Sequence, residues 1–286
     1  MKKFALIGVS GFVSERHLIA IKETGNILTL AYDVNKNLSL LKKYFPKCLF
    51  TTKLNNFEKM LSTKKIQYLS ICSPNHLHLK HILIGLNNNL KIICEKPLVI
   101  NASQIKKIEK LPKNKKDKIN SILQLRCHPS LIKMKKKLSK NKKENKVKLI
   151  YYTERSPQYF ESWKGNKTKS GGILMNVGVH FFDMLIWFFG NVVKTKVKKM
   201  TPELSYGYLY FNNAFVEWKL HLKKKYGNNL KVKRSINING EEIIFSKTFK
   251  DLHVLNYQQI LKSKKSNLNN ALNSIKLINK LNKNAI

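Results

Sequence analysis

Four side chains that can take part in chemistry recur at helical spacing in the middle of the chain. Asn176, His180, Asp183 and Trp187 are four, three and four residues apart, which predicts that they share one face of a single helix. The residues around them are apolar, so the helix is expected to be buried. An unpaired buried polar group costs about 1–3 kcal/mol, so this face needs partners. A satisfied core histidine is the simpler interpretation of the helix alone.

A second candidate for proton transfer is Lys96, between Glu95 and Pro97 at the end of the apolar segment 91–94. Parallel sheets bind ligands at the carboxyl ends of their strands, and a cis bond before Pro97 would aim the lysine sharply. Lysine acts as a base near neutral pH only when burial or nearby positive charge lowers its pKa. A surface salt bridge with Glu95 is the alternative interpretation.

The start of the chain is typical of a nucleotide-binding β-turn-α-β unit. An apolar strand, 4–8, ends in Gly8, Gly11 follows, and a second strand at 27–32 precedes Asp33. Glycines let a pyrophosphate approach the backbone at a helix N-terminus. An acidic residue after the second strand can hold the adenosine ribose, which favours NAD over NADP. The motif reads G-x-x-G-x-x-S rather than G-x-G-x-x-G, so an ordinary α/β turn remains an alternative.

The chain has 55 Lys and Arg residues against 16 Asp and Glu, a formal net charge of +39. Nucleic-acid binding is one explanation. However, only four of the basic residues are arginine, the residue that phosphate and base recognition favour. The lysines are spread widely, and Lys, Asn and Ile share A/T-rich codons, so mutational bias explains the charge without a nucleic-acid partner. A basic surface still attracts an anionic substrate.

Length, cysteines and hydropathy indicate a globular protein of a reducing cytoplasm. The 286 residues, 43% of them hydrophobic, are enough for about two domains. The four cysteines form no C-x-x-C pair and no disulfide framework, and no metal site is predicted. No apolar run reaches about 18 residues, so no membrane-spanning helix is expected. The apolar segment at the start lacks a signal-peptide cleavage site.

Four motifs occur in an order and at a spacing that resemble the Gfo/Idh/MocA family, which includes glucose–fructose oxidoreductase and inositol dehydrogenase. They are Gly8-x-x-Gly11, Ser73-Pro74-Asn75-x-x-His78, Glu95-Lys96-Pro97 and Gly171-Gly172-x-x-x-Asn176-x-Gly178-x-His180-x-x-Asp183. The resemblance covers nearly the whole chain. Finer features are similar to one branch, the UDP-N-acetyl-glucosaminuronate 3-dehydrogenases of surface polysaccharide (lipopolysaccharide, diamino-uronate) biosynthesis. They lie at 4–8, 122–130, 162–165, 169–172, 239–242 and 251–253.

The resemblance implies an NAD-binding α/β Rossmann domain, 1–123, and a substrate-binding and oligomerisation α+β domain, 124–286, with an open, mostly antiparallel sheet. The sequence agrees, because strand-like segments alternate with helices in the first half and six follow in the second. The first-half strands after Asp33 are expected at 66–71, 91–94 and 121–125. The second-half strands are expected at 148–153, 192–197, 206–211, 214–220, 232–238 and 242–245. Asn212-Asn213 and Asn239-Gly240 indicate hairpins.

The resemblance also implies site residues. The predicted NAD-binding residues are Gly8, Gly11, Phe12, Val13, Asp33, Ser73, Pro74, Asn75, His78 and Glu95. The predicted catalytic residues are Lys96 and His180. The predicted substrate-binding residues are Asn176, Arg155, Tyr159, Trp163, Lys164 and Asp183, with Arg126 as a less certain member. In the segment 155–164, cations would bind the pyrophosphate and the carboxylate, and aromatic rings would pack on the sugar or uracil; a surface loop with ordinary packing aromatics is the alternative.

The reaction that the resemblance implies moves a hydride from a sugar carbinol carbon to NAD, while a base takes the hydroxyl proton. Many family members carry Asp where this chain has Asn176. Because Asn cannot take a proton, we expect Asn176 to position the substrate or His180 and leave open which of Lys96 and His180 is the base. Some branch members regenerate NAD with 2-oxoglutarate. Nothing in this sequence decides that step.

Three functions stay open from the sequence. The first is oxidation of the 3-hydroxyl of UDP-N-acetyl-glucosaminuronate by a cytoplasmic homodimer or homotetramer. The second is NAD-dependent oxidation of another sugar or polyol such as inositol, for which Arg155 and Lys164 would be unnecessary. The third is a non-enzymatic basic binding protein, against which intact Lys96 and His180 argue.

Overall fold

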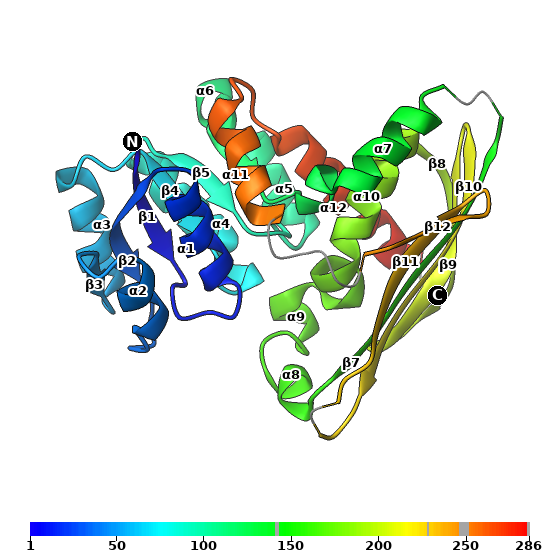
Figure 1. Ribbon diagram of the computed structural model, residues 1–286, viewed down its shortest axis with the longest axis horizontal. Helices are drawn as coiled ribbons and strands as arrows, with labels where there is room; N and C mark the ends of the chain where they lie inside the picture. The colour runs from blue at the N-terminus through cyan, green and yellow to red at the C-terminus, as the bar shows by residue number, and fades with distance from the viewer. Residues whose placement is uncertain (141–142, 228, 246–251, 285–286) are drawn as a thin grey trace. The chain divides into compact units, whose positions relative to one another are not determined.

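The chain forms two compact units in the computed structural model, which describes residues 1–140, 143–227, 229–245 and 252–284 (Figure 1). The first unit comprises Met1–Val99, Ser103–Gln124 and Lys250–Ala271, and the second Ile100–Ala102, Leu125–Phe249 and Leu272–Ile286. The predicted domains, 1–123 and 124–286, stay a prediction. By contacts, the late segment 252–271 lies with the first unit although the sequence assigned it to the second domain.

The first unit is built on a six-stranded sheet in the order β3-β2-β1-β4-β5-β6, and all of its pairs are parallel. Its strands are β1 (Lys3–Ile7), β2 (Ile27–Tyr32), β3 (Leu49–Thr51), β4 (Tyr68–Ile71), β5 (Lys91–Cys94) and β6 (Ile119–Ser121). The central strands read as near-continuous apolar runs because helices cover parallel sheets on both faces. The order reverses between β1 and β4, the switch point at which such sheets bind ligands.

Helices connect these strands. In chain order they are α1 (Ser14–Glu23), α2 (Ser39–Tyr44), α3 (Leu54–Thr63), the 3-10 turn η1 (Asn75–Leu77), α4 (His78–Asn87), α5 (Ala102–Glu109) and α6 (Lys113–Lys116). A late helix, α11 (Leu252–Lys262), packs against α1 (Figure 1). Its Tyr257 and Ile260 are part of the same buried core as Phe4 and Leu6 of β1. The chain therefore completes the core of its first unit with a segment that follows most of the second.

The second unit has a six-stranded sheet in the order β12-β11-β7-β10-β9-β8. Its strands are β7 (Asn145–Arg155), β8 (Val192–Met200), β9 (Leu204–Phe211), β10 (Ala214–Lys224), β11 (Val232–Ile238) and β12 (Glu241–Ile244). Among the described pairs of this second sheet, only β7 and β10 are parallel. The predicted fold class, a Rossmann sheet with a second, mostly antiparallel sheet, is confirmed. Both predicted hairpins are confirmed as well, because they join β9 to β10 and β11 to β12.

One face of this second sheet is buried beneath helices. Burial alternates along β7 and β10, as expected for a sheet with one covered face. From α10 (Val179–Phe189), Phe182 meets Trp218 of β10 edge to face at 5.4 Å, and Phe189 contacts Phe211 of β9 at 5.5 Å. Figure 1 shows α7 (Pro129–Leu138) on the same side of the sheet as α10. The remaining elements are η2 (Gln124–Cys127), α8 (Pro157–Glu161), α9 (Lys167–Ser170), η3 (Leu174–Gly178) and α12 (Leu268–Lys283).

Two sequence expectations need correction. The predicted strand at 121–125 ends at Ser121, and the 3-10 turn η2 occupies Gln124–Cys127. The single helix predicted to carry Asn176 and His180 begins as a π-helical turn, η3, before α10. At this turn Gly178 lies so close to β10 that an added Cβ would come within 2.8 Å of Leu220 Cδ1. We attribute the wider turn to this tertiary contact, which residue spacing does not encode.

The helical segment Lys167–Phe189 is long and apolar enough to cross a membrane by length and composition, although no such segment was expected from the sequence. In its most apolar 18-residue window, 72% of the residues are buried inside the fold. The contacts of Phe182 and Phe189 with the second sheet account for this apolar character. The segment therefore has the surroundings of a core helix.

Candidate active site

The glycine turn after β1 is shaped by close backbone packing. Gly8 has φ +89°, and an added Cβ would lie 2.7 Å from both Cys72 C and Ser73 N. Its amide donates to Tyr32 O at 2.9 Å. Any side chain at this position would strike the turn that follows β4, so only glycine lets the two turns approach each other. The pyrophosphate contact that the sequence predicted at this turn stays a prediction.

Asp33 fixes the same turn from the end of β2. Its Oδ2 accepts a 2.9 Å hydrogen bond from Ser10 N, and its Oδ1 accepts one of 2.9 Å from Asn35 N. The carboxylate thus orders the glycine turn, and carboxylate oxygens have further lone pairs for ribose hydroxyls. Nearby, Phe12 is 87% exposed, whereas Val13 packs against the core. These positions are compatible with the predicted cofactor roles, which stay predictions.

The Ser73–His78 motif joins the turns that follow β4 and β5. The ring of His78 is fully buried, with Nδ1 2.7 Å from Pro97 O and Nε2 2.8 Å from Ser73 O. Burial lowers the pKa of His78, although the two carbonyl oxygens act in the opposite direction. Ser73 Oγ lies 2.8 Å from Nδ1 of His81, whose pKa burial lowers to about 3. His78 therefore links the turn at Ser73 to the turn at Pro97. Pro74 and buried Asn75 lie between Ser73 and His78 in the sequence.

Glu95 and Lys96 follow β5 and differ in exposure. Glu95 is 5% exposed, and its Oε1 lies 3.0 Å from His17 Nε2 and 2.7 Å from His253 Nε2. Burial raises the pKa of Glu95, but the hydrogen bonds from the two imidazoles outweigh burial and hold the pKa well below its usual range. Lys96 is partly buried, and its bond to Pro97 is cis, as predicted. The predicted role of Glu95 at the nicotinamide ribose stays a prediction.

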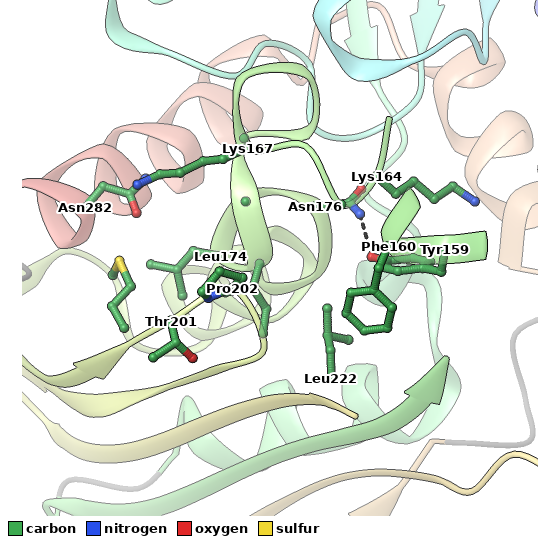
Figure 2. A pocket seen from close by; sticks show the side chains of 15 residues that line it. Tyr159, Phe160, Lys164, Lys167, Leu174, Asn176, Thr201, Pro202, Leu222 and Asn282 are labelled. Atoms are coloured by element: carbon green, nitrogen blue, oxygen red, sulfur yellow. Dashed lines mark hydrogen bonds between the residues drawn. The ribbon is translucent and has the colours of Figure 1, made fainter. Parts of the chain in front are cut away.

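A pocket in the second unit gathers cationic, aromatic and amide side chains (Figure 2). Its volume of about 160 Å³ is small beside the roughly 300–1,000 Å³ typical of pockets for drug-sized ligands, so it suits one part of a larger substrate. Three predicted substrate residues line it: Tyr159, Lys164 and Asn176. Other lining residues include Phe160, Lys167, Leu174, Thr201, Pro202, Leu222 and Asn282.

Four predicted residues interact with one another at or beside this pocket. Asn176 Nδ2 donates to Tyr159 Oη at 2.8 Å (Figure 2). The Lys164 ammonium lies 5.8 Å from the centroid of the Tyr159 ring and 5.9 Å from that of Trp163. Burial, and secondarily the charge of Arg155, lowers the pKa of Lys164. Burial raises the pKa of Tyr159 to about 12, so its hydroxyl stays protonated at neutral pH.

Arg155 extends this cationic cluster. Its guanidinium lies 5.4 Å from the centroid of the Tyr159 ring, and Nη2 donates to Tyr151 Oη at 3.2 Å. Arg155 precedes Tyr159 in the sequence and Lys164 follows it, and both cations interact with the ring of Tyr159. Two positive charges around one amphipathic ring form a site that attracts an anion carrying an apolar face.

Asp183 is buried in an ion pair with Arg126. It is 2% exposed, and its two oxygens accept 2.9 and 2.8 Å hydrogen bonds from Arg126 Nε and Nη2. The same guanidinium lies 5.9 Å from the centroid of the Trp187 ring. Burial raises the pKa of Asp183, with Arg126 acting against it. These contacts assign Asp183 to an internal ion pair, and its proposed contact with substrate stays a prediction. His180, one turn earlier in α10, is partly buried.

Sequence reasoning missed part of each environment. Pocket residues Thr201 and Pro202, between β8 and β9, and Asn282 of α12 belong to no motif, and only the fold brings them beside Tyr159. His253 had a weak signal, because it occurs within the branch segment 251–253, whereas His17 lies in none of the segments compared with the family; neither received a role. Of the branch segment 251–253, Asp251 lies outside the described residues.

Comparison with known families identifies both halves of the chain. An oxidoreductase family model with an NAD-binding Rossmann fold matches residues 2–121. A model for the C-terminal alpha/beta domain of the same oxidoreductase family matches residues 143–218. Together they cover most of both sheets.

Among solved structures, the chain is similar to the WlbA (WbpB) dehydrogenase from Thermus thermophilus. Two of its crystal structures, one with NAD and alpha-ketoglutarate and one with NAD and UDP-GlcNAcA, each match with a TM-score of 0.92 and 36% identity. The alignment covers 98% of this chain and 94% of the Thermus chain.

Curated relatives match over shorter stretches. The oxidoreductase YteT from Bacillus subtilis (strain 168) is 24% identical over 191 residues, which are 64% of this chain and 42% of YteT. Glucose-6-phosphate 3-dehydrogenase from the same organism is 23% identical over 194 residues, 66% of this chain and 53% of the relative. The matched part thus spans about half the length of these relatives.

Proposed function

The chain belongs to the Gfo/Idh/MocA family of NAD-dependent oxidoreductases, and we propose that it oxidises the 3-hydroxyl of UDP-N-acetyl-glucosaminuronate to the 3-keto sugar. The observation that carries the substrate class is the cationic and aromatic cluster of Arg155, Tyr159 and Lys164. A uronate carboxylate or a pyrophosphate needs cations, and a sugar or uracil needs a ring face. The Thermus dehydrogenase, crystallised with this nucleotide sugar, is 36% identical over 98% of the chain.

NAD fits the residues at the end of the first sheet. Gly8 packs so closely on the Ser73 turn that only glycine fits there, and backbone amides hold the Asp33 carboxylate beside this turn, as the proposed ribose contact requires. When bound, NAD supplies the hydride acceptor, which no side chain replaces. An acidic group at Asp33 disfavours a 2′-phosphate and therefore NADP. The side chains then have to place the sugar and move one proton.

We assign that proton to Lys96 or His180. Lys96 lies in the turn after β5, at the carboxyl edge of the parallel sheet, and His180 lies in the first turn of α10. Histidine titrates near neutral pH without help, whereas lysine needs a lowered pKa. Asn176 cannot take a proton, and its bond to Tyr159 makes it a positioning residue for the substrate side. The pH profiles of turnover in Lys96 and His180 variants will decide which of the two residues is the base.

A second substrate, another sugar or polyol, is favoured by one comparison. Glucose-6-phosphate 3-dehydrogenase is named for oxidation at the same sugar position of an anionic sugar. Glucose 6-phosphate and the substrate that we propose are both negatively charged, which suits Arg155 and Lys164. This comparison therefore favours a sugar phosphate over an uncharged polyol such as inositol. The third alternative, a non-enzymatic basic binding protein, is set aside because the chain belongs to an oxidoreductase family.

Further properties follow as parts of the same proposal. We place the enzyme in the cytoplasm, in surface polysaccharide biosynthesis. We also propose a homodimer or homotetramer that associates through the second sheet, because its outward face carries partly exposed aromatics. These are Tyr206, Tyr208, Tyr210 and Phe215. Such apolar surface is typical of an interface.

The test is to add UDP-N-acetyl-glucosaminuronate to the purified protein, with and without NAD and 2-oxoglutarate. Reduced nicotinamide is followed by absorbance and the sugar by mass spectrometry. We expect a 3-keto product, and sustained turnover with 2-oxoglutarate would show that it regenerates NAD. Faster turnover of glucose 6-phosphate would favour the second substrate. No turnover of either, with NAD bound, would refute the proposed substrate class.

A further inference from the structure

Five buried side chains in the first unit form a chain of hydrogen bonds, and four of them have no part in the cofactor and substrate assignments. Ser70 Oγ lies 2.7 Å from Tyr257 Oη, and Tyr257 Oη lies 2.7 Å from His17 Nδ1. His17 Nε2 lies 3.0 Å from Glu95 Oε1, which His253 Nε2 approaches to 2.7 Å. Glu95 is 5% exposed, and the other four are at most 1% exposed. We call these five residues the Glu95 network.

An ionised Glu95 fixes the direction of the two bonds to it: it only accepts, so both facing Nε2 atoms carry hydrogen. In the Nε2–H tautomer, His17 has a bare Nδ1, which accepts from the hydroxyl of Tyr257. The oxygen of Tyr257 in turn accepts from Ser70. The network is therefore one directed path from Ser70 through Tyr257 and His17 to the carboxylate, with His253 as a second donor.

The path ends at the backbone of the proposed proton-transfer residue. Lys96 N donates to Glu95 Oε2 at 3.2 Å, and His78 Nδ1 lies 2.7 Å from Pro97 O on the other side of Lys96. Buried imidazoles thus brace both ends of the Lys96 turn. Two of the network residues, His253 and Tyr257, are four apart on α11 and so share one face of that helix.

We propose that His253 and Tyr257 are positioning residues for the reaction: through Glu95 they hold the turn that carries Lys96. The effect on turnover rests on the proposed function, in which Lys96 takes part in proton transfer. The segment after the second sheet then has a task in the first unit. A displaced reacting group, even by about 1 Å, can cost on the order of a hundredfold in rate.

Titratable groups in and around this network also interact with Glu95 and His253. Glu95 interacts electrostatically with His78, Cys72, Cys94 and Tyr257, and His253 with Arg16. Burial lowers the pKa of His253 although Glu95 acts against it. Its Nδ1 has no hydrogen-bond partner among the described residues. A neutral ring leaves only a bare acceptor there, whereas a protonated ring would leave a buried N–H unpaired.

The same atoms raise the question of a metal ion. One ligand atom each of His17, Glu95 and His253 lie within 4.8 Å of one another, a set that can hold a cation. The 2.7 and 3.0 Å separations are those of direct hydrogen bonds, which need a proton on each Nε2. A protonated nitrogen cannot ligate a metal. The two assignments are therefore exclusive and can be separated by experiment.

The test compares variants of the full chain. Tyr257→Phe removes the hydroxyl and keeps the ring beside Phe4. His253→Leu removes the donor to Glu95, and His253→Gln retains an N–H donor. Matched controls are Tyr226→Phe and His221→Gln, which change the same chemistry outside the network. Turnover across pH, NAD affinity and metal content are measured for each.

We expect Tyr257→Phe and His253→Leu to lower kcat about tenfold, with NAD affinity changed less than about threefold. The acid limb of the pH profile should move upward, because Glu95 loses support for its charge. His253→Gln should recover most of kcat, and both controls should match wild type. Wild-type kcat and pH profile in Tyr257→Phe and His253→Leu would overturn the proposal, as would one divalent ion bound per chain.

A substrate-free measurement separates this proposal from the proposed function. The chain has 8 histidines, so ¹⁵N-imidazole spectra of the NAD-bound protein can be assigned with the variants. We expect His17 and His253 as Nε2–H tautomers in the wild type, and a shifted Nδ1 resonance of His17 in Tyr257→Phe, because that nitrogen loses its hydrogen bond. If no sugar is turned over but these tautomers are found, the proposed function fails and the network stands. Bare Nε2 atoms in the wild type would refute the network itself.

Discussion

The two predicted site regions hold their polar groups in contrasting ways. In the first unit, the network around Glu95 is buried, and its carboxylate takes hydrogen bonds from two imidazoles and a backbone amide. In the second unit, Tyr159 and Lys164 are partly buried beside a pocket, and a cation–ring contact links them.

This contrast indicates which of the two regions holds its side chains more rigidly. Buried, hydrogen-bonded groups have few low-energy arrangements because any lost partner is costly. Long cationic side chains over rings can shift with little loss. NAD is the same molecule in every turnover and suits the fixed region. A substrate of variable sugar and charge suits the adaptable one. The four predictions below test this comparison.

The largest expected effect comes from the fixed region. Lys96→Ala should lower turnover by about 10²–10⁴-fold, the usual contribution of a positioned acid or base. NAD affinity should stay within about threefold of wild type, because the glycine turn and Asp33 are untouched. Stopped-flow kinetics and NADH fluorescence measure the two quantities. Lys91→Ala is the control, because Lys91 lies at the exposed start of β5, the strand that precedes Lys96. Equal losses of turnover in both variants would show that Lys96 takes no part in the chemistry.

In the adaptable region, Lys164→Met should raise KM for UDP-N-acetyl-glucosaminuronate by about 10–100-fold, the scale of one lost charged hydrogen bond. Turnover at saturation should change little. Steady-state kinetics at several salt concentrations check this, with Lys169→Met of exposed Lys169 as the matched control. If KM for an uncharged polyol rises equally, Lys164 packs the pocket and does not bind an anion.

Tyr159→Phe should have a smaller effect. The variant keeps the ring that faces Arg155 and Lys164 and removes the oxygen that accepts from Asn176. One neutral hydrogen bond contributes about 0.5–1.5 kcal/mol, so KM should rise roughly three- to tenfold. Tyr208→Phe on the second sheet is a control that should not change KM. A loss in kcat alone would place the hydroxyl in the chemical step.

The last prediction concerns acid stability between pH 7 and pH 5. Burial lowers the pKa of His78, His81 and His253 in the first unit, that of His81 to about 3. Below about pH 6.5 these histidines bind protons in the unfolded chain but stay neutral in the folded one. The free energy of unfolding therefore falls as the pH falls.

The second unit has a weaker balance of the same kind. His128 and His221 also have pKa values lowered by burial and act in the same direction. The raised pKa of Asp183 acts in the opposite direction, because the folded state takes up its proton first. We therefore expect hydrogen exchange to rise in β1, β4 and β5 at a pH about half a unit above that of the second sheet. Exchange that rises in both sheets at one pH would contradict this difference.

The sequence by itself determined the order of elements and the identity of the motifs. Apolar runs without alternation placed the parallel strands, for example 27–32 and 91–94, at the bounds that the structure has. Asn239-Gly240 marked a hairpin because both residues accept positive φ. Lys96 was singled out by its place after an apolar strand, and Tyr159 and Lys164 by the family resemblance, whose motifs are local in the chain.

Only the tertiary structure decided which polar groups meet. Tyr257 lies 240 residues after His17, and Arg126 lies 57 residues before Asp183, yet each pair is joined by a hydrogen bond. Residue spacing describes a single helix or strand, whereas these contacts depend on packing between elements. Burial then forces each polar group to find whichever partner the fold supplies. For this reason Glu95 and Asp183, predicted to touch ligands, have internal partners that no local pattern reveals.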